Sequence, residues 1–239
     1  MPITNTSPIL VIIPVHNEKG TIADVINEVR NKAPPCDILV VDDASNDGSL
    51  KIARQTGVLV VDLPFNLGIG GAVQTGFKIA KQRGYDIVVQ VDGDGQHDPS
   101  FIGQLVKPLI AGTSDISIGS RHLHEETAEP SLTRRAGMRF FSWLTSRLTS
   151  STVTDCSSGF RALNKRAFSL FADDYPVDFP DAEALIAAHR AGLTISEIPT
   201  RFRQRDQGQS SLRAWRLFYY PLKETFSILM MMSRRQSQA

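Results

Sequence analysis

The chain has 239 residues, of which 41% are hydrophobic and 21% charged, the composition of a soluble globular protein that buries a core. Its formal net charge of +1 argues against a nucleic-acid-binding domain at the level of the whole chain. The 2 cysteines are too few and too far apart for a disulfide framework or a zinc cluster, so we expect a reduced, cytosolic setting.

Charge and hydropathy differ between the two ends of the chain. The N-terminus has no basic region followed by a long apolar run, so no signal peptide is expected. No run of 18 apolar residues occurs, which predicts that no segment spans a bilayer unaided. After residue 200 the chain has 8 Lys and Arg against 2 acids, a charge of +6 that leaves −5 for the first 200 residues. A mildly acidic body with a basic tail fits a protein that meets an anionic surface through one end.

The first half alternates short, β-branched apolar runs with segments of helical pattern. Strands are expected at Pro8–Val15, Asp37–Val41, Val58–Asp62, Asp86–Val91 and Asp115–Ile118. Helices are expected at Thr21–Asn31, Ser49–Gln55, Ala72–Gln82 and Pro99–Ile110. This alternation predicts βαβ units and a mainly parallel sheet flanked by helices, an α/β fold.

The second half is less regular and has no internal repeat. We expect a helix over Leu132–Ser150 and a turn-rich segment over Asp155–Leu163. A helix is expected over Asp181–Ala191, closed by Gly192, and a strand over Leu193–Ile198.

Polar, mostly acidic residues follow the predicted strands. In chain order they are His16, Asn17 and Glu18, then Asp42 and Asp43, Asp62, Asp92 and Asp94, and Arg121. In open α/β sheets ligands bind outside the carboxyl ends of the strands. We therefore expect this edge of the sheet to be the active site.

Asp92-Gly93-Asp94 is the first candidate for chemistry. Two carboxylates one residue apart, with glycine between them, can turn toward one divalent cation, and Mg²⁺ and Mn²⁺ prefer oxygen ligands shared with phosphate. A solvated acidic turn is the plainer alternative. A calcium loop of the EF-hand type is rejected, because its sixth position would be His97 and its twelfth Gly103.

Other motifs have competing interpretations. Asp42-Asp43 can hydrogen-bond ribose hydroxyls or a base N–H, while Asn46 or Asp47 can cap the next helix. The glycines from Gly68 to Gly71 are not a dinucleotide fingerprint, since the third glycine would fall at Val73. The histidines lack the helical spacing and cysteine partners of a zinc site.

With these strand ends assembled, the sequence resembles the family-2 nucleotide-sugar glycosyltransferases of the Rossmann-like GT-A fold. Its likeness is greatest to the dolichyl-phosphate mannosyltransferase-like, or polyprenyl-phosphate hexosyltransferase, branch, and it extends from about Ile9 to about Leu212. The segments that carry the resemblance are PVHNE from Pro14, VDDASNDGS from Val41, Asn66-Leu67-Gly68 with Gly71-Ala72, DGDGQH from Asp92 with Pro99, Gly119-Ser120-Arg121, and DCSSGFR from Asp155.

The resemblance implies roles for individual residues. The nucleotide site comprises Pro14, Asn17, Glu18, Asp42, Asp43, Asn66, Gly71 and Asp92. The Mg²⁺ or Mn²⁺ ligands on the diphosphate are Asp92, Asp94 and Gln96. The phosphate or acceptor site comprises Arg121, Arg205 and Ser210, and the catalytic set is Asp94, Arg121, Arg205 and Glu183, the last as a base or orienting group. The branch often has Gly-x-Ser-Lys-Leu where this chain has Gly208-Gln209-Ser210-Ser211-Leu212, and the missing lysine leaves the lipid phosphate and the donor base undetermined.

The tail is a second, independent signal. Residues 1–211 are expected to form the GT-A domain and 212–239 an amphipathic, basic helical extension. Aromatic and apolar residues with a basic fringe are typical of an interfacial helix, although packing on the enzyme body or on a partner protein is equally consistent. Pro221 would kink a single helix here.

Together these features predict an inverting transferase. It would move a hexose from a UDP- or GDP-linked donor to a polyprenyl phosphate, in the cytoplasm at the inner membrane face. Two alternatives stay open: transfer to a sugar hydroxyl in glycan assembly, and a catalytically silent nucleotide-sugar-binding or scaffold subunit. A lipid phosphate is largely ionised near neutral pH and needs little help from a general base.

Overall fold

The computed structural model describes residues 8–123, 142–149, 152–176 and 181–203. The predicted site residues Arg205 and Ser210 and the predicted extension 212–239 lie outside these ranges, as does most of the predicted helix Leu132–Ser150. Of that helix, residues 142–149 are described and are helical.

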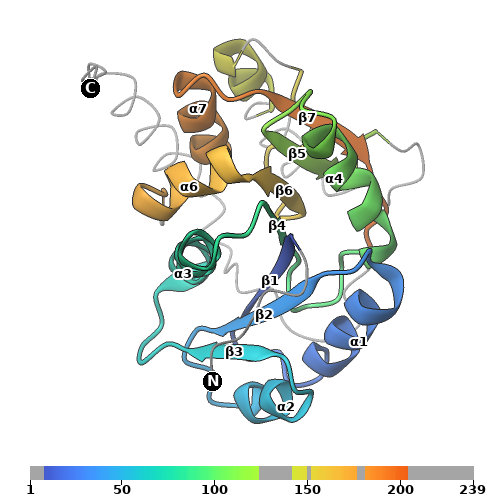
Figure 1. The fold of residues 1–239 in the computed structure, drawn as a ribbon, viewed down its shortest axis with the longest axis vertical. Coiled ribbons are helices and arrows are strands. Elements are labelled where there is room, and N and C mark those ends of the chain that lie inside the picture. Colours follow the sequence, from blue (N-terminus) through green and yellow to red (C-terminus); the bar gives the residue numbers. More distant parts are fainter. Residues whose placement is uncertain (1–7, 124–141, 150–151, 177–180, 204–239) are drawn as a thin grey trace, which may run out of the picture.

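One sheet of seven strands organises the described chain (Figure 1). Its order is β3-β2-β1-β4-β6-β5-β7. The strands are β1 (Ile9–Val15), β2 (Asp37–Asp42), β3 (Leu59–Asp62), β4 (Ile87–Gln90), β5 (Ile116–Ser120), β6 (Arg161–Asn164) and β7 (Ile195–Pro199). All neighbouring pairs are parallel except those of β6, which runs antiparallel to both β4 and β5. The predicted α/β fold is confirmed, and β6 begins inside the segment Asp155–Leu163, which was predicted to be turn-rich.

Helices cover both faces of the sheet, as the continuous apolar strands predict. They are α1 (Ile22–Lys32), α2 (Ser49–Gln55), α3 (Gly68–Arg83), α4 (Ile102–Ile110), α6 (Lys165–Asp173) and α7 (Ala182–Arg190), with a 3₁₀ turn η1 (Pro99–Phe101) before α4. Leu10 and Ile12 of β1 pack in the core beneath α3, α6 and α7, and the alternate residues Val11 and Ile13 pack beneath α1, α2 and α4. Figure 1 shows these two helical layers on opposite sides of the sheet.

Helix α3 begins four residues before the predicted start at Ala72. The cause is a long-range contact, because the carboxylate of Asp43 accepts the backbone N–H groups of Leu67 and Gly68 at 2.7 and 2.9 Å. An acidic group at this position satisfies N–H groups that have no partner within the helix. None of the helices in the described part of the chain combines the length and the apolar character needed to cross a bilayer.

Helix α3 packs against β1 at Gly76. A Cβ atom on Gly76 would lie 2.5 Å from Ile12 Cδ1 and 2.6 Å from Ile12 Cγ2, and Ile12 is fully buried. The contact therefore requires glycine for space rather than for backbone conformation.

We expect Gly76→Ala to lower the free energy of unfolding by about 1–3 kcal/mol through overpacking. Gly103→Ala is the matched control, since Gly103 is also helical and its Cβ would meet Pro34 Cγ at an ordinary 3.5 Å. That control should be neutral or stabilising by up to about 1 kcal/mol, because alanine favours helix. Urea denaturation of both variants measures the difference, and equal effects would contradict this account of the α3–β1 contact.

Candidate functional site

The carboxyl ends of β1, β2, β4 and β5 lie at one edge of the sheet. The antiparallel direction of β6 brings its first residue, Arg161, to the same edge, beside Gln90 at the end of β4 and Ile118 of β5. The loop that precedes β6 therefore joins the strand-end residues singled out in the sequence.

The β1–β2 side of this edge contains every predicted nucleotide residue except Asp92. Asn17, with φ of +59°, accepts the N–H of Asn46 on its Oδ1 at 2.9 Å, and the N–H of Glu18 donates to Ser49 Oγ at 2.8 Å. Asn66 Nδ2 donates to the Asp43 carbonyl at 3.3 Å. Pro14 lies on β1 beside β2, and Gly71 lies in the first turn of α3. The structure brings the group together, and its binding of a nucleotide stays a prediction.

The two adjacent acids of this group differ in their availability. Both carboxylate oxygens of Asp43 are occupied by the N–H groups at the start of α3. Asp42 is fully buried, its Oδ2 accepts the N–H of Ser45 at 3.0 Å, and its Oδ1 has no hydrogen-bond partner among the described residues. A buried acceptor without a donor is rare. Within the described part of the chain, Asp42 is thus the acid with an unpaired oxygen, although this oxygen is buried beneath the surface of the site.

Asp92 is held by neighbours on several sides. Gln90 Nε2 donates to its Oδ1 at 3.1 Å, and His97 Nε2 lies 3.6 Å from its Oδ2. The N–H of Asp92 donates to His97 Nδ1 at 3.0 Å, so the proton of the neutral ring is on Nε2 and faces the carboxylate. His97 is buried and stacked on Phe160, and burial lowers its pKa. A Cβ on Gly159 would lie 2.9 Å from Asp92 Oδ2, so this carboxylate requires glycine beside it.

Asp94 and Gln96 complete the turn after β4. Asp94 Oδ1 accepts the N–H of Gln96 at 3.0 Å. Gln96 is paired with Arg203, whose N–H donates to the Gln96 carbonyl at 2.8 Å and whose carbonyl accepts Gln96 Nε2 at 3.3 Å. The Gln96 amide nitrogen is therefore engaged, and only its side-chain oxygen could face an ion.

A metal at this turn would depend on the substrate for part of its coordination. Among the described residues, no three His, Cys, Asp or Glu side chains cluster as metal ligands. Asp92 and Asp94 offer two carboxylates, and Mg²⁺ is commonly held by one or two carboxylates with phosphate oxygens and water. The residues fit a shared metal of this kind, and the predicted ligand set of Asp92, Asp94 and Gln96 stays a prediction.

Arg121 is locked to Asp155. Its Nε donates to Asp155 Oδ2 at 2.7 Å, its Nη2 to Asp155 Oδ1 and to Ser157 Oγ at 2.8 Å, and its backbone N–H to Asp155 Oδ2 at 3.1 Å. The guanidinium also lies over the Phe202 ring, 5.0 Å from its centre. Burial would raise the pKa of Asp155, but the hydrogen bonds and charge of Arg121 outweigh it and lower the pKa. Among the described residues Nη1 has no partner, so this nitrogen is available to a phosphate oxygen.

Three charged residues of the site are absent from the set predicted from the sequence: Arg161, Asp181 and Asp155, the last of which binds Arg121. Asp181 immediately precedes α7, and Arg161 Nη2 donates to its carbonyl at 3.3 Å. Burial, with smaller contributions from the charges of Asp92 and Asp155, raises the pKa of Asp181 to about 6 against the opposing charge of Arg161. Glu183, the acid chosen from the sequence, lies two residues further on, in the first turn of α7. The sequence offers Asp181 as a second acid beside Glu183, but only the residues that the fold places around Asp181 mark it as part of the site.

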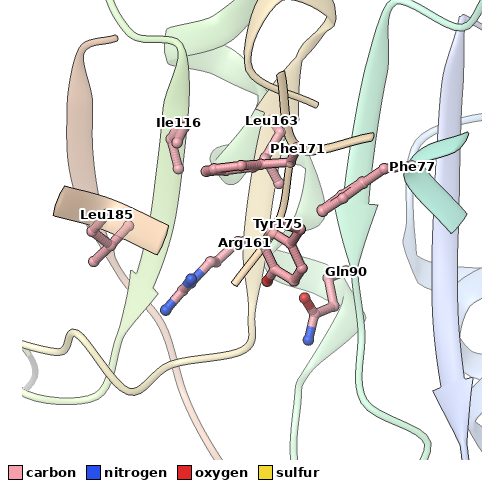
Figure 2. A pocket seen from close by; sticks show the side chains of 8 residues that line it. All are labelled: Phe77, Gln90, Ile116, Arg161, Leu163, Phe171, Tyr175 and Leu185. Carbon is pink, nitrogen blue, oxygen red and sulfur yellow. The ribbon is translucent and has the colours of Figure 1, made fainter. Parts of the chain in front are cut away.

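A small cavity lies just inside this edge of the sheet, between β4, β5, β6 and the helices that cover them (Figure 2). Gln90, Arg161 and Tyr175 point their polar ends to the same end of it, and apolar side chains such as Phe77 and Phe171 line the rest. Its volume of about 10 Å³ leaves room for water but not for a sugar. A sugar nucleotide would have to bind over the open edge of the sheet.

The raised pKa of Asp181 predicts a pH-dependent stability. Between about pH 4 and pH 6 the folded state keeps a proton on Asp181 that the unfolded state has released, so this residue destabilises the fold increasingly as pH rises. Asp181→Asn removes that penalty. Relative to wild type, its free energy of unfolding should rise by about 1–3 kcal/mol between about pH 4 and pH 7, after allowance for partial solvent exposure.

Urea denaturation across this pH range measures the effect. Asp173→Asn is the control, because Asp173 is an exposed acid of α6 whose partner is Lys81. The account of Asp181 fails if the difference between Asp181→Asn and wild type is constant with pH or falls.

Comparison with known proteins matches the chain to one family. Residues 10–171 match the family model of glycosyl transferase family 2. The UDP-N-acetylglucosamine–dolichyl-phosphate N-acetylglucosaminyltransferase of Methanococcus voltae is 32% identical over 213 residues, covering 81% of this chain and 84% of the relative. The undecaprenyl-phosphate mannosyltransferase of Micrococcus luteus is 31% identical over 225 residues, covering 85% and 87%.

A solved structure has the same fold. Glucosyl-3-phosphoglycerate synthase of Mycobacterium tuberculosis, crystallised with Mn²⁺, UDP and phosphoglyceric acid, superposes with a TM-score of 0.65 at 19% identity, covering 96% of this chain and 80% of that one. With the family model spanning more than half of the residues, the chain belongs to glycosyl transferase family 2.

Proposed function

We propose that this chain transfers a hexose from a nucleoside-diphosphate sugar to a polyprenyl phosphate, with inversion at the anomeric carbon. The observation that carries the proposal is the charged cluster at the carboxyl edge, where Asp155 binds Arg121 and the loop that contains Asp155 also brings Gly159 against the carboxylate of Asp92. The relatives named above, which act on dolichyl or undecaprenyl phosphate, support the acceptor class.

The donor would span the edge from β2 to β6. The exposed Asn17 and Asn66 on the β1–β2 side suit the nucleoside, and the turn at Asp92 and Asp94 suits the diphosphate through a shared Mg²⁺ or Mn²⁺. Such an ion, when bound, neutralises charge on the diphosphate and helps it to depart. This order places the sugar over Gln90, Arg161 and Asp181 on the β6 side.

The reaction would be a single displacement. A phosphate oxygen of the acceptor forms a bond to the anomeric carbon while the bond from that carbon to the diphosphate breaks, and the diphosphate takes the electron pair. Negative charge therefore grows on the leaving diphosphate, where Arg121 Nη1 can donate a hydrogen bond. The bond from Arg121 to Asp155 holds the guanidinium in place beforehand, which makes such stabilisation effective.

The expected role of Asp181 differs between the two acceptor classes, a phosphate and a sugar hydroxyl. An ionised phosphate has no proton to lose, so Asp181 would only orient groups on the sugar. A sugar hydroxyl must lose a proton, and a carboxylate with a pKa of about 6 is well suited to accept it. Membrane contact through residues 212–239, and with it a position at the cytoplasmic face, belongs to the same proposal.

The test is transfer of label into lipid. Purified full-length protein is mixed with vesicles that contain undecaprenyl or dolichyl phosphate, with Mg²⁺ or Mn²⁺, and with radiolabelled UDP- or GDP-sugars in turn. We expect one donor to give an organic-soluble, acid-labile product, and Asp94→Asn to slow transfer by about 100-fold or more, the scale of a lost charge-stabilising group. Asp173→Asn, on the outer surface of α6, should leave the rate unchanged.

Each other outcome changes one part of the proposal. An acid-stable, water-soluble product made with added glycan would favour a hydroxyl acceptor, and transfer should then depend strongly on Asp181. Normal turnover of Asp94→Asn in the presence of EDTA would refute the metal assignment. Absence of both transfer and donor hydrolysis with every sugar would favour a silent binding subunit.

A further inference from the structure

A row of polar side chains crosses the sheet just below the site. Glu197 of β7 is paired with Ile118 of β5, Ile118 with Arg161 of β6, and Arg161 with Gln90 of β4. Residues paired side by side project to the same face of a sheet. Ile118 belongs to the buried core on this face, so Glu197, Arg161 and Gln90 interrupt an otherwise apolar surface. Buried polar groups at such positions need specific partners.

Glu197 holds the start of the loop that leads into β6. Its Oε1 accepts the backbone N–H groups of Thr154 and Asp155, each at 2.8 Å. Its Oε2 accepts the hydroxyl of Thr154 at 2.8 Å. One carboxylate therefore fixes two consecutive peptide groups, and bonds to a charged acceptor are the stronger kind.

Arg161 holds the rest of the same loop by donating hydrogen bonds to backbone carbonyl groups of the loop. Its Nη2 donates to the carbonyl of Cys156 and its Nε to the carbonyl of Ser158, both at 2.7 Å. Figure 2 shows its guanidinium at the same polar end of the cavity as the Tyr175 hydroxyl and the Gln90 amide, with Tyr175 between the other two. The loop from Thr154 to Ser158 is thus held by a carboxylate at its N–H groups and by a guanidinium at its carbonyl groups.

What this loop positions is Arg121. The backbone N–H of Asp155 donates to Glu197, and the carboxylate of Asp155 accepts hydrogen bonds from the guanidinium of Arg121. Thr154 Oγ1 adds a second link, because it lies 2.8 Å from the hydroxyl of Ser120, the residue before Arg121. A continuous chain of hydrogen bonds leads from Glu197 to the guanidinium of Arg121, whose Nη1 has no partner among the described residues.

We propose that Glu197 is a positioning residue for sugar transfer, which acts through Thr154 and Asp155 to hold Arg121 with its Nη1 directed at the leaving diphosphate. The role of Arg121 rests on the function proposed above, whereas the physical coupling of Glu197 to Arg121 does not. Glu197 lies on the last described strand, and among the described residues it makes no hydrogen bond to the predicted nucleotide residues or to the predicted metal turn.

Two substitutions at Glu197 separate this role from bulk stability. Glu197→Ala removes all three acceptor contacts and is expected to lower kcat at least tenfold with little change in KM for the donor. Glu197→Gln is expected to keep kcat within about threefold of wild type, because its amide oxygen can accept both N–H groups and its NH₂ can donate to Thr154 Oγ1. Asp173→Asn is the control for removal of an acid elsewhere and should change neither constant.

A double-mutant cycle tests the route of the effect. In an Arg121→Met background, Glu197→Ala should slow transfer no further, because the group that it positions is gone. Equal losses in both backgrounds, or wild-type kcat in Glu197→Ala, would overturn the proposal. If Glu197→Ala does not fold, Thr154→Ala replaces it, with a loss of several-fold expected that is likewise absent without Arg121.

A substrate-free measurement keeps the two proposals distinct. In NMR spectra the side-chain Nε–H of Arg121, assigned by its absence in Arg121→Met, should exchange slowly with water in wild type and in Glu197→Gln. It should exchange at least tenfold faster in Glu197→Ala or Thr154→Ala. Unchanged exchange in both alanine variants would refute the coupling even if transfer is found, and faster exchange would uphold it even if the chain proves to act on another acceptor.

Discussion

The antiparallel insertion of β6 between β4 and β5 is the constraint on which the rest of the site depends. In a purely parallel sheet the chain would reach the carboxyl edge only after each strand. Because β6 runs the other way, the loop before it also lies at that edge and brings Asp155, Gly159 and Arg161 next to Asp92. Gly159 then allows the close approach of the Asp92 carboxylate, whose oxygens would lie 2.9 and 3.2 Å from any Cβ there.

This arrangement gathers charged side chains at positions that the fold also shields from water. A buried carboxylate is costly unless a cation and hydrogen bonds compensate it, and Asp155 has both in Arg121. Removal of either partner would leave the other charge buried and uncompensated, so each depends on the other for its place in the fold. The same reasoning applies to His97, which is neutral, stacked on Phe160, and able to direct its Nε2–H at Asp92. The site is therefore organised before any substrate arrives, the condition under which electrostatic stabilisation of a transition state is most effective.

The sequence was sufficient for features that depend on local pattern. The apolar runs of β1, β2, β4 and β5 predicted the sheet, and the strand-end rule located Asp42, Asp92 and Arg121 at one edge. Features set by long-range contacts were not accessible. Helix α3 starts early because Asp43 caps it from 24 residues away, and β6 is a four-residue strand whose first residue is arginine. Asp181 and Glu197 have no distinguishing neighbours in sequence, and their importance comes only from the residues that the fold places around them.

The central claim is that one diphosphate and one divalent ion bind where the end of β4 meets the start of β6, and paramagnetic NMR tests it most directly. Mn²⁺ added with UDP or GDP to the full-length protein broadens the signals of nearby amides. The account predicts that broadening is centred on Asp92–Gln96 and Gly159, extends to Ser45 and Asn46, and is lost in Asp94→Asn. Broadening centred on the opposite end of the sheet, at Ile9, Asp86 and Ile110, or broadening that persists unchanged in Asp94→Asn, would contradict it.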